Sequence, residues 1–143
     1  MKNLLVRDWM TKQVITGDTE LTLPEAHELM KEHGIRRLPI TRNGKLVGIV
    51  TRSDIRGAQP SSATSLSIWE MNYLLSKLTM GKIMTEAVFT ITPDATLKDA
   101  ATIMHDKKVG ALPVVADGQI AGVITESDVF RAMIAGFDKD ESG

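Results

Sequence analysis

The chain has 143 residues, which is long enough for one compact domain with a buried core. A net charge of −1 and an aromatic content of 4% argue against binding nucleic acid through a broad basic surface or through stacked aromatic rings. There is no cysteine, so we expect no disulfides and no cysteine metal sites. No apolar stretch approaches the roughly 18 residues that span a membrane, and the first residues reach a charge too soon for a secretory signal. We therefore expect a cytoplasmic protein.

The first half of the chain alternates strand and helix signals. A β-branched run at 14–16 predicts a short strand, and Thr22-x-x-Glu25 is a capping box that opens a helix. Pro39 lies in the next predicted strand and suits an edge or a bulge there. Asn43-Gly44 is a hairpin turn, followed by an apolar strand at 46–50 and a helix that begins after Thr51.

A linker at 58–79 follows, first small and polar, then helical. Ser67-x-x-Glu70 is another capping box, and apolar residues recur behind it at helical spacing. We expect most of this connector helix to pack on the core, with a dimer or partner contact as the alternative.

The segment 10–55 then recurs without a gap at 84–129, with 15 identical residues and a constant offset of 74. The second copy has its own strand signal at 88–90, capping box Thr96-x-x-Asp99 and hairpin turn Asp117-Gly118. Internal repetition of this kind predicts two similar sites related by an approximate two-fold axis. The predicted organisation is therefore a first repeat at 1–57, the linker at 58–79, a second repeat at 80–137 and a disordered tail at 138–143.

The strongest site candidates are Thr51-Arg52-Ser53-Asp54 and Thr125-Glu126-Ser127-Asp128, each of which follows an apolar strand and opens a helix. Amide groups at a helix start favour a phosphate, the threonine hydroxyl can bond to it, and a carboxylate suits the vicinal diol of a ribose. The alternative is that both tetrapeptides are only capping boxes. Their occurrence in both copies favours a ligand role.

Arg36 and Arg37 form a second candidate, because paired arginines beside a strand can hold phosphate; solvated surface charges are the alternative. The second copy has Gly110-Ala111 there, so if both sites bind nucleotide, we expect the first to be the more phosphate-dependent one. The three histidines do not align between the copies, and the sequence has no nucleophile motif, Walker loop or dinucleotide fingerprint. We therefore predict no catalytic residue and no metal ligand.

The combined motifs resemble the cystathionine-β-synthase (CBS) domain pair, also called a Bateman module, over nearly the whole chain. The motifs that carry the resemblance are Met10-Thr11 and Met84-Thr85 at the repeat starts, the Gly34–Ile40 and Val109–Val114 segments, and the Gly48–Asp54 and Gly122–Asp128 endings. The linker helix is also similar to that of stand-alone CBS proteins of the acetoin-utilisation type.

This resemblance implies an α/β (α+β) fold of tandem β-α-β-β-α repeats packed about a pseudo-two-fold axis. It also implies clefts between the repeats for AMP, ADP, ATP or S-adenosylmethionine, with Asp54 and Asp128 on the ribose. Threonines and basic residues would meet phosphate, and strand residues would flank the adenine. The implied ligand-binding residues are Ile15, Thr16, Arg36, Arg37, Pro39, Ile40, Thr51, Arg52, Ser53, Asp54, Phe89, Thr90, Gly110, Ala111, Pro113, Val114, Thr125, Ser127 and Asp128.

The expected function is a non-enzymatic sensor of adenine nucleotides. It would need no cofactor beyond that regulatory ligand and would form a homodimer. It would act on a protein partner that the sequence does not identify, and it would bind neither nucleic acid nor a membrane. One alternative is a structural or interaction scaffold with vacant clefts. A small nucleotide hydrolase is disfavoured, because each candidate site offers a single carboxylate and no evident base or metal cluster.

Overall fold

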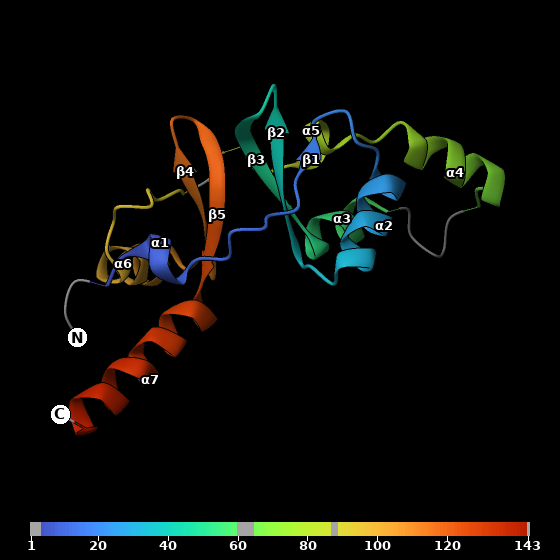
Figure 1. Ribbon diagram of the computed structural model, residues 1–143. Helices are drawn as coiled ribbons and strands as arrows, with labels where there is room; N and C mark the ends of the chain where they lie inside the picture. The colour runs from blue at the N-terminus through green and yellow to red at the C-terminus, as the bar shows by residue number, and fades with distance from the viewer. Residues whose placement is uncertain (1–3, 60–64, 87–88, 143) are drawn as a thin grey trace. The chain divides into compact units, whose positions relative to one another are not determined.

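The computed structural model describes residues 4–59, 65–86 and 89–142, and the chain divides into two compact units. Unit 1 consists of Met1–Val14 together with Phe89–Gly143, and unit 2 is Ile15–Val88. Each unit is thus built mainly from one sequence repeat, but the segment that begins each repeat belongs to the other unit. The mixed α/β class expected from the sequence is confirmed (Figure 1).

Unit 2 is a small sheet with helices packed against it. Its central strand β2 pairs in parallel with β1 and antiparallel with β3. The elements of this unit are β1 (Gly17–Asp18), α2 (Leu23–His33), β2 (Arg37–Arg42), β3 (Lys45–Thr51), α3 (Arg52–Ala58), α4 (Ile68–Ser76) and α5 (Met80–Ile83).

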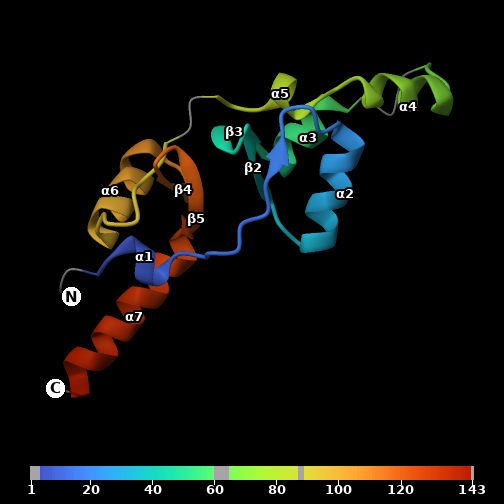
Figure 2. The ribbon, with the colours of Figure 1, turned by 45° about the horizontal axis from the view of Figure 1, so that its top comes forward.

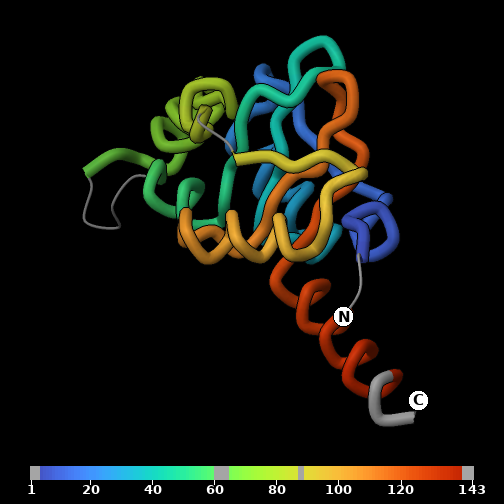
Figure 3. The backbone as a smooth tube through the Cα atoms, turned by 90° about the vertical axis from the view of Figure 1, so that its left-hand side faces the viewer, coloured from blue at the N-terminus to red at the C-terminus, as the bar shows by residue number. Residues whose placement is uncertain are grey.

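Unit 1 repeats the plan with an antiparallel hairpin of β4 and β5, to which Ile91 adds a single parallel bridge at Val114. Its long last helix extends well beyond the hairpin and α6 (Figure 3). The elements of this unit are α1 (Val6–Trp9), α6 (Leu97–Lys107), β4 (Ala111–Ala116), β5 (Gln119–Thr125) and α7 (Glu126–Ser142).

Each unit has its own hydrophobic core, drawn from the helix faces and the inward side of the strands. The core of unit 2 consists of Leu23, Ala26, Met30, Leu38, Ile40, Val50, Ile55 and Met80. The core of unit 1 consists of Val6, Ile91, Leu97, Ala100, Met104, Leu112, Val114, Ile124 and Ala132. The helix faces predicted from apolar spacing at 23, 26 and 30, and at 97, 100 and 104, are confirmed as buried.

The repeated Met-Thr pairs and glycines lie where the segment that begins each repeat packs against a strand of the unit that it joins. The segment from α1 lies against β5 and α6, so that Thr11 bridges Val123, and Thr85 bridges Ile49 in the same manner (Figures 1 and 2). A Cβ at Gly122 would lie 2.6 Å from the carbonyl oxygen of Thr11, which is too close for any side chain. The equivalent Cβ at Gly48 would lie 2.5 Å from the sulfur of Met84.

The local signals in the sequence are confirmed. Both hairpin turns have positive φ at their two central residues, as at Asn43 (53°) and Gly44 (80°). Thr22 and Thr96 form complete capping boxes with Glu25 and Asp99. The backbone N–H and the hydroxyl of Thr22 hold the pKa of the Glu25 carboxyl below its usual range.

The strand predicted at 14–16 is wrong, because β1 is limited to Gly17–Asp18. The chain passes from unit 1 to unit 2 at 14–15, and residues 14–16 make no ladder or bridge with the described strands. In the second copy Val88 lies outside the described residues, Phe89 and Thr90 are not in a strand, and only Ile91 makes a bridge. Pro39 lies in β2, which is paired on both sides, and not in an edge strand. It is next to a register shift at Ile40/Thr41, and the ladder with β1 begins only at Ile40, one residue later.

The expectation that most of the connector helix packs on the core is also wrong. Helix α4 has no buried residue, and only Leu75 and the following Leu78 pack partly against the unit 2 core. Trp69 is 81% exposed and Tyr73 62% exposed on this helix. Residues 138–142, predicted as a disordered tail, continue helix α7 to Ser142.

Candidate functional site

The first candidate site begins with a capping box at the end of β3. Thr51 N–H donates to Oδ2 of Asp54 over 2.8 Å, and Asp54 N–H donates to the Thr51 hydroxyl over 3.2 Å. The capping role raised from the sequence is therefore real. It engages only one carboxylate oxygen, however, and within the described chain Oδ1 of Asp54 accepts no hydrogen bond. Capping and ribose binding are thus compatible in the same residue.

Four arginines surround the space beside this capping box. Arg36 and Arg37 precede and begin β2, while Arg52 and Arg56 lie one helical turn apart on α3. None of the four guanidinium groups makes an ion pair or hydrogen bond within the described residues. They line a cavity of about 470 Å³ with Thr51 and Ser53, and none of the described residues that line it carries a carboxylate.

A second hollow adjoins the first across Arg52 and Arg56. Its volume is about 350 Å³, and its other lining residues include His27 and Lys31 on α2. The two hollows share Arg52 and Arg56 on α3. We call them together the basic groove and define it by His27, Lys31, Arg36, Arg37, Arg52 and Arg56. Cavities of this size match those that hold small-molecule ligands.

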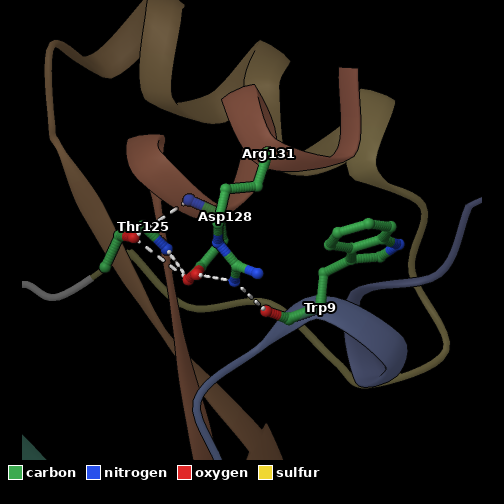
Figure 4. Close-up of polar contacts among 4 residues, drawn as sticks. All are labelled: Trp9, Thr125, Asp128 and Arg131. Carbon is green, nitrogen blue, oxygen red and sulfur yellow. Dashed lines mark hydrogen bonds and ion pairs between the residues drawn. The ribbon is translucent and has the colours of Figure 1, made fainter. Parts of the chain in front are cut away.

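The equivalent place in unit 1 has a different character. The counterparts of Arg36, Arg37, Arg52 and Arg56 at the offset of 74 are Gly110, Ala111, Glu126 and Phe130, so four positive charges are replaced by one negative charge. The capping box itself is kept, because Thr125 N–H donates to Oδ2 of Asp128 over 2.9 Å. Asp128 is only 5% exposed and also contacts Arg131 (Figure 4).

The remaining predicted site residues of the two units differ in how far they are buried. Ile15 and Thr16 are half-buried just before β1, and Phe89 and Thr90 are exposed before the Ile91 bridge. Ile40 and Val114, which the resemblance assigns to the adenine, are fully buried in the two cores. Pro39 and Pro113 are buried beside them, and Ser127 is exposed at the start of α7.

The sequence reasoning missed Arg56, which shares both hollows with Arg52. The signal was present, because residues four apart on a helix lie on one face. It also missed Arg131, three residues after Asp128, and that spacing is likewise a helical neighbour.

The described residues contain no group of three or more histidine and acidic side chains placed to hold a metal ion. No helix in the described part of the chain combines the length and the apolar character needed to cross a membrane.

The family model of the CBS domain matches the chain twice, at residues 6–61 and 80–135. The chain belongs to the CBS-domain family. The two matched segments begin at the first residues of α1 and α5, the helices that complete the opposite units.

Several curated relatives contain a similar CBS pair. Inosine-5'-monophosphate dehydrogenase of Korarchaeum cryptofilum is 36% identical over 137 residues, covering 94% of this chain but 26% of that enzyme. The protein MJ1225 of Methanocaldococcus jannaschii is 33% identical over 91% of this chain and 47% of its own length. This chain thus spans less than half of these relatives. A CBS domain-containing protein of Dictyostelium discoideum is 31% identical and is matched over 92% of both chains.

Solved structures share the fold. AcuB from Vibrio cholerae, whose name refers to acetoin utilization, has a TM-score of 0.79 and 34% identity over 99% of this chain and 98% of its own. The CBS domain pair of MJ0100 was solved with 5'-methylthioadenosine and S-adenosyl-L-methionine, with a TM-score of 0.75 and 30% identity over 94% of this chain and 98% of its own. CBSX2 was solved with AMP, with a TM-score of 0.74 and 29% identity over 92% of this chain and 97% of its own.

Proposed function

We propose that this CBS pair is a non-enzymatic regulatory module that binds an adenosine nucleotide in unit 2. Asp54 would accept hydrogen bonds from the ribose diol, and the basic groove would hold the phosphates. The observation that carries the proposal is a set of four arginines beside a capping box with one free carboxylate oxygen, all without a partner among the described residues. The AMP and S-adenosylmethionine complexes of related CBS pairs support the adenosine part.

The charge of the groove favours a polyphosphate over the other candidates. Arginine binds phosphate through paired, charge-assisted hydrogen bonds, and the four arginines and Lys31 exceed what one phosphate can engage. S-adenosylmethionine carries a positive sulfonium, which these arginines would repel. We therefore expect affinity to rise from AMP to ADP to ATP, with S-adenosylmethionine binding least well.

Binding alone would regulate by favouring one arrangement of the protein over another. A ligand shifts such an equilibrium only as far as its affinities for the two arrangements differ. We infer that a protein partner reads the favoured arrangement, and that this takes place in the cytoplasm. The scaffold alternative, with vacant clefts, requires that no nucleotide binds.

The test is isothermal titration of AMP, ADP, ATP and S-adenosylmethionine into the wild type and Asp54→Ala. We expect Asp54→Ala to weaken ATP binding by about tenfold to 100-fold, because a hydrogen bond to a charged group contributes about 1.5–3 kcal/mol. Glu25→Ala is the matched control, since it removes a capping carboxylate from α2 in the same unit. Wild type that binds none of the four ligands contradicts the proposal, and so does an unchanged affinity in Asp54→Ala.

We also propose that the chain forms a homodimer. Large apolar side chains exposed in the described chain support this, among them Trp69 on α4 and Phe130, Ile134 and Phe137 along α7. Sedimentation equilibrium should give twice the mass of 15.6 kDa, and a monomer at micromolar concentration would contradict it.

A further inference from the structure

Both oxygens of the Asp128 carboxylate in unit 1 accept hydrogen bonds from the same chain. Oδ2 accepts from the backbone N–H of Thr125 over 2.9 Å and from its hydroxyl over 3.0 Å. Oδ1 accepts from Nη2 of Arg131 over 2.6 Å, and the Asp128 side chain is only 8% exposed (Figure 4). A ribose diol approaching this carboxylate finds both oxygens already bonded.

Arg131 is held in place by Trp9 as well as by Asp128. Its Nη2 lies 3.5 Å from the carbonyl oxygen of Trp9, and its guanidinium carbon lies 5.7 Å from the centre of the Trp9 ring. A cation over an indole face is attracted by the ring. Figure 4 shows the guanidinium between the carboxylate and the helix α1 that carries Trp9.

Unit 2 has neither of these two residues at the equivalent positions. The counterpart of Arg131 is Gly57, and the counterpart of Trp9 is Ile83. Oδ1 of Asp54 is accordingly free within the described chain, and Thr51 does not donate its hydroxyl to Asp54 as Thr125 does to Asp128. The two sites therefore differ in the availability of the ribose acceptor, in addition to the charge around it.

We propose that Arg131 closes the candidate site of unit 1, so that each chain binds one nucleoside, in unit 2. This proposal rests on the function proposed for Asp54. Displacing the guanidinium would leave a buried carboxylate without its cation, and a neutral diol cannot replace that interaction. Arg131 is thus a specificity-determining residue that acts by occupying Asp128.

The first experiment counts binding sites with adenosine, which carries the diol but no phosphate and so does not depend on the arginines of unit 2. Equilibrium dialysis should give one equivalent per chain for the wild type and two for Arg131→Ala. Arg131→Gln, which keeps much of the side chain but not the charge, should also give two. Circular dichroism and a cooperative unfolding transition check that each variant is folded.

The reciprocal variant transfers the arginine to unit 2. A Cβ at Gly57 meets no atom within 4 Å, and Gly57 lies within helix α3, so a side chain is accommodated there. Gly57→Arg places a guanidinium three residues after Asp54, and we expect adenosine affinity to fall by about tenfold or more. Gly57→Gln is the matched control, with a similar length and helix propensity but no charge, and should retain wild-type affinity.

Each result bears separately on the two proposals. One equivalent in both wild type and Arg131→Ala, or two in wild type, overturns the closure by Arg131 and leaves the unit 2 site intact. No binding by wild type but one equivalent in Arg131→Ala supports the closure and contradicts the unit 2 site. Unchanged adenosine affinity in Gly57→Arg overturns the closure, and no binding in any variant overturns both proposals.

Discussion

Replacing Arg36 and Arg37 together by alanine is expected to weaken ATP binding by about 100-fold or more and to leave adenosine affinity within about threefold of wild type. Both guanidinium groups line the cavity of unit 2 and have no partner in the described chain. Each charge-assisted hydrogen bond to phosphate contributes about 1.5–3 kcal/mol, so two lost arginines account for a factor of this size. Isothermal titration with ATP and adenosine at two salt concentrations measures both the loss and the weakened salt dependence.

Arg42→Ala is the matched control, because Arg42 is an exposed cation at the other end of β2 and does not line the cavity. It should change ATP affinity by less than about twofold, since surface charges outside a site contribute little. An equal loss of ATP and adenosine affinity in the double variant would mean that the arginines stabilise the unit rather than bind phosphate. An unchanged ATP affinity would place the phosphates elsewhere.

Met80→Ala is expected to lower the free energy of unfolding by about 2–5 kcal/mol, the range for removing a fully buried methionine side chain. Met80 lies at the start of the second sequence repeat, but its side chain is 0% exposed in the core of unit 2. The location of the effect is therefore as informative as its size. Hydrogen exchange should accelerate in α2, β2 and β3, and remain slow in α6, β4 and β5.

Two variants control this prediction. Val6→Ala is the counterpart at the offset of 74 and should accelerate exchange in α6, β4 and β5 instead, because Val6 is buried in the core of unit 1. Met71→Ala removes the same side chain from α4, outside both cores, and should have a much smaller effect on stability. Faster exchange in α6, β4 and β5 of Met80→Ala would contradict the assignment of α5 to unit 2.

Much of the candidate site could be predicted because its features are local or repeated. The capping carboxylates Asp54 and Asp128 follow their threonines by three residues, and the pair Arg36-Arg37 is adjacent in sequence. Comparison of the two copies also shows that the second lacks these arginines. Arg52 was predicted as part of the same tetrapeptide as Asp54, whereas Arg56 was missed, and only the structure shows that both line one cavity with Arg36 and Arg37.

The turns, the helix starts, the buried helix faces and the repeat could all be predicted from the sequence, because they depend on φ preferences, on hydrogen bonds three residues apart and on apolar spacing. The tertiary structure decided which segments complete each core, that 14–16 is not a strand, and that α4 stays largely exposed. The contact of Asp128 with Arg131 also depends on tertiary structure, because Trp9, which helps to hold Arg131 on that carboxylate, is over 100 residues away in the chain. Such pairings depend on burial and long-range contacts, which no local sequence window contains.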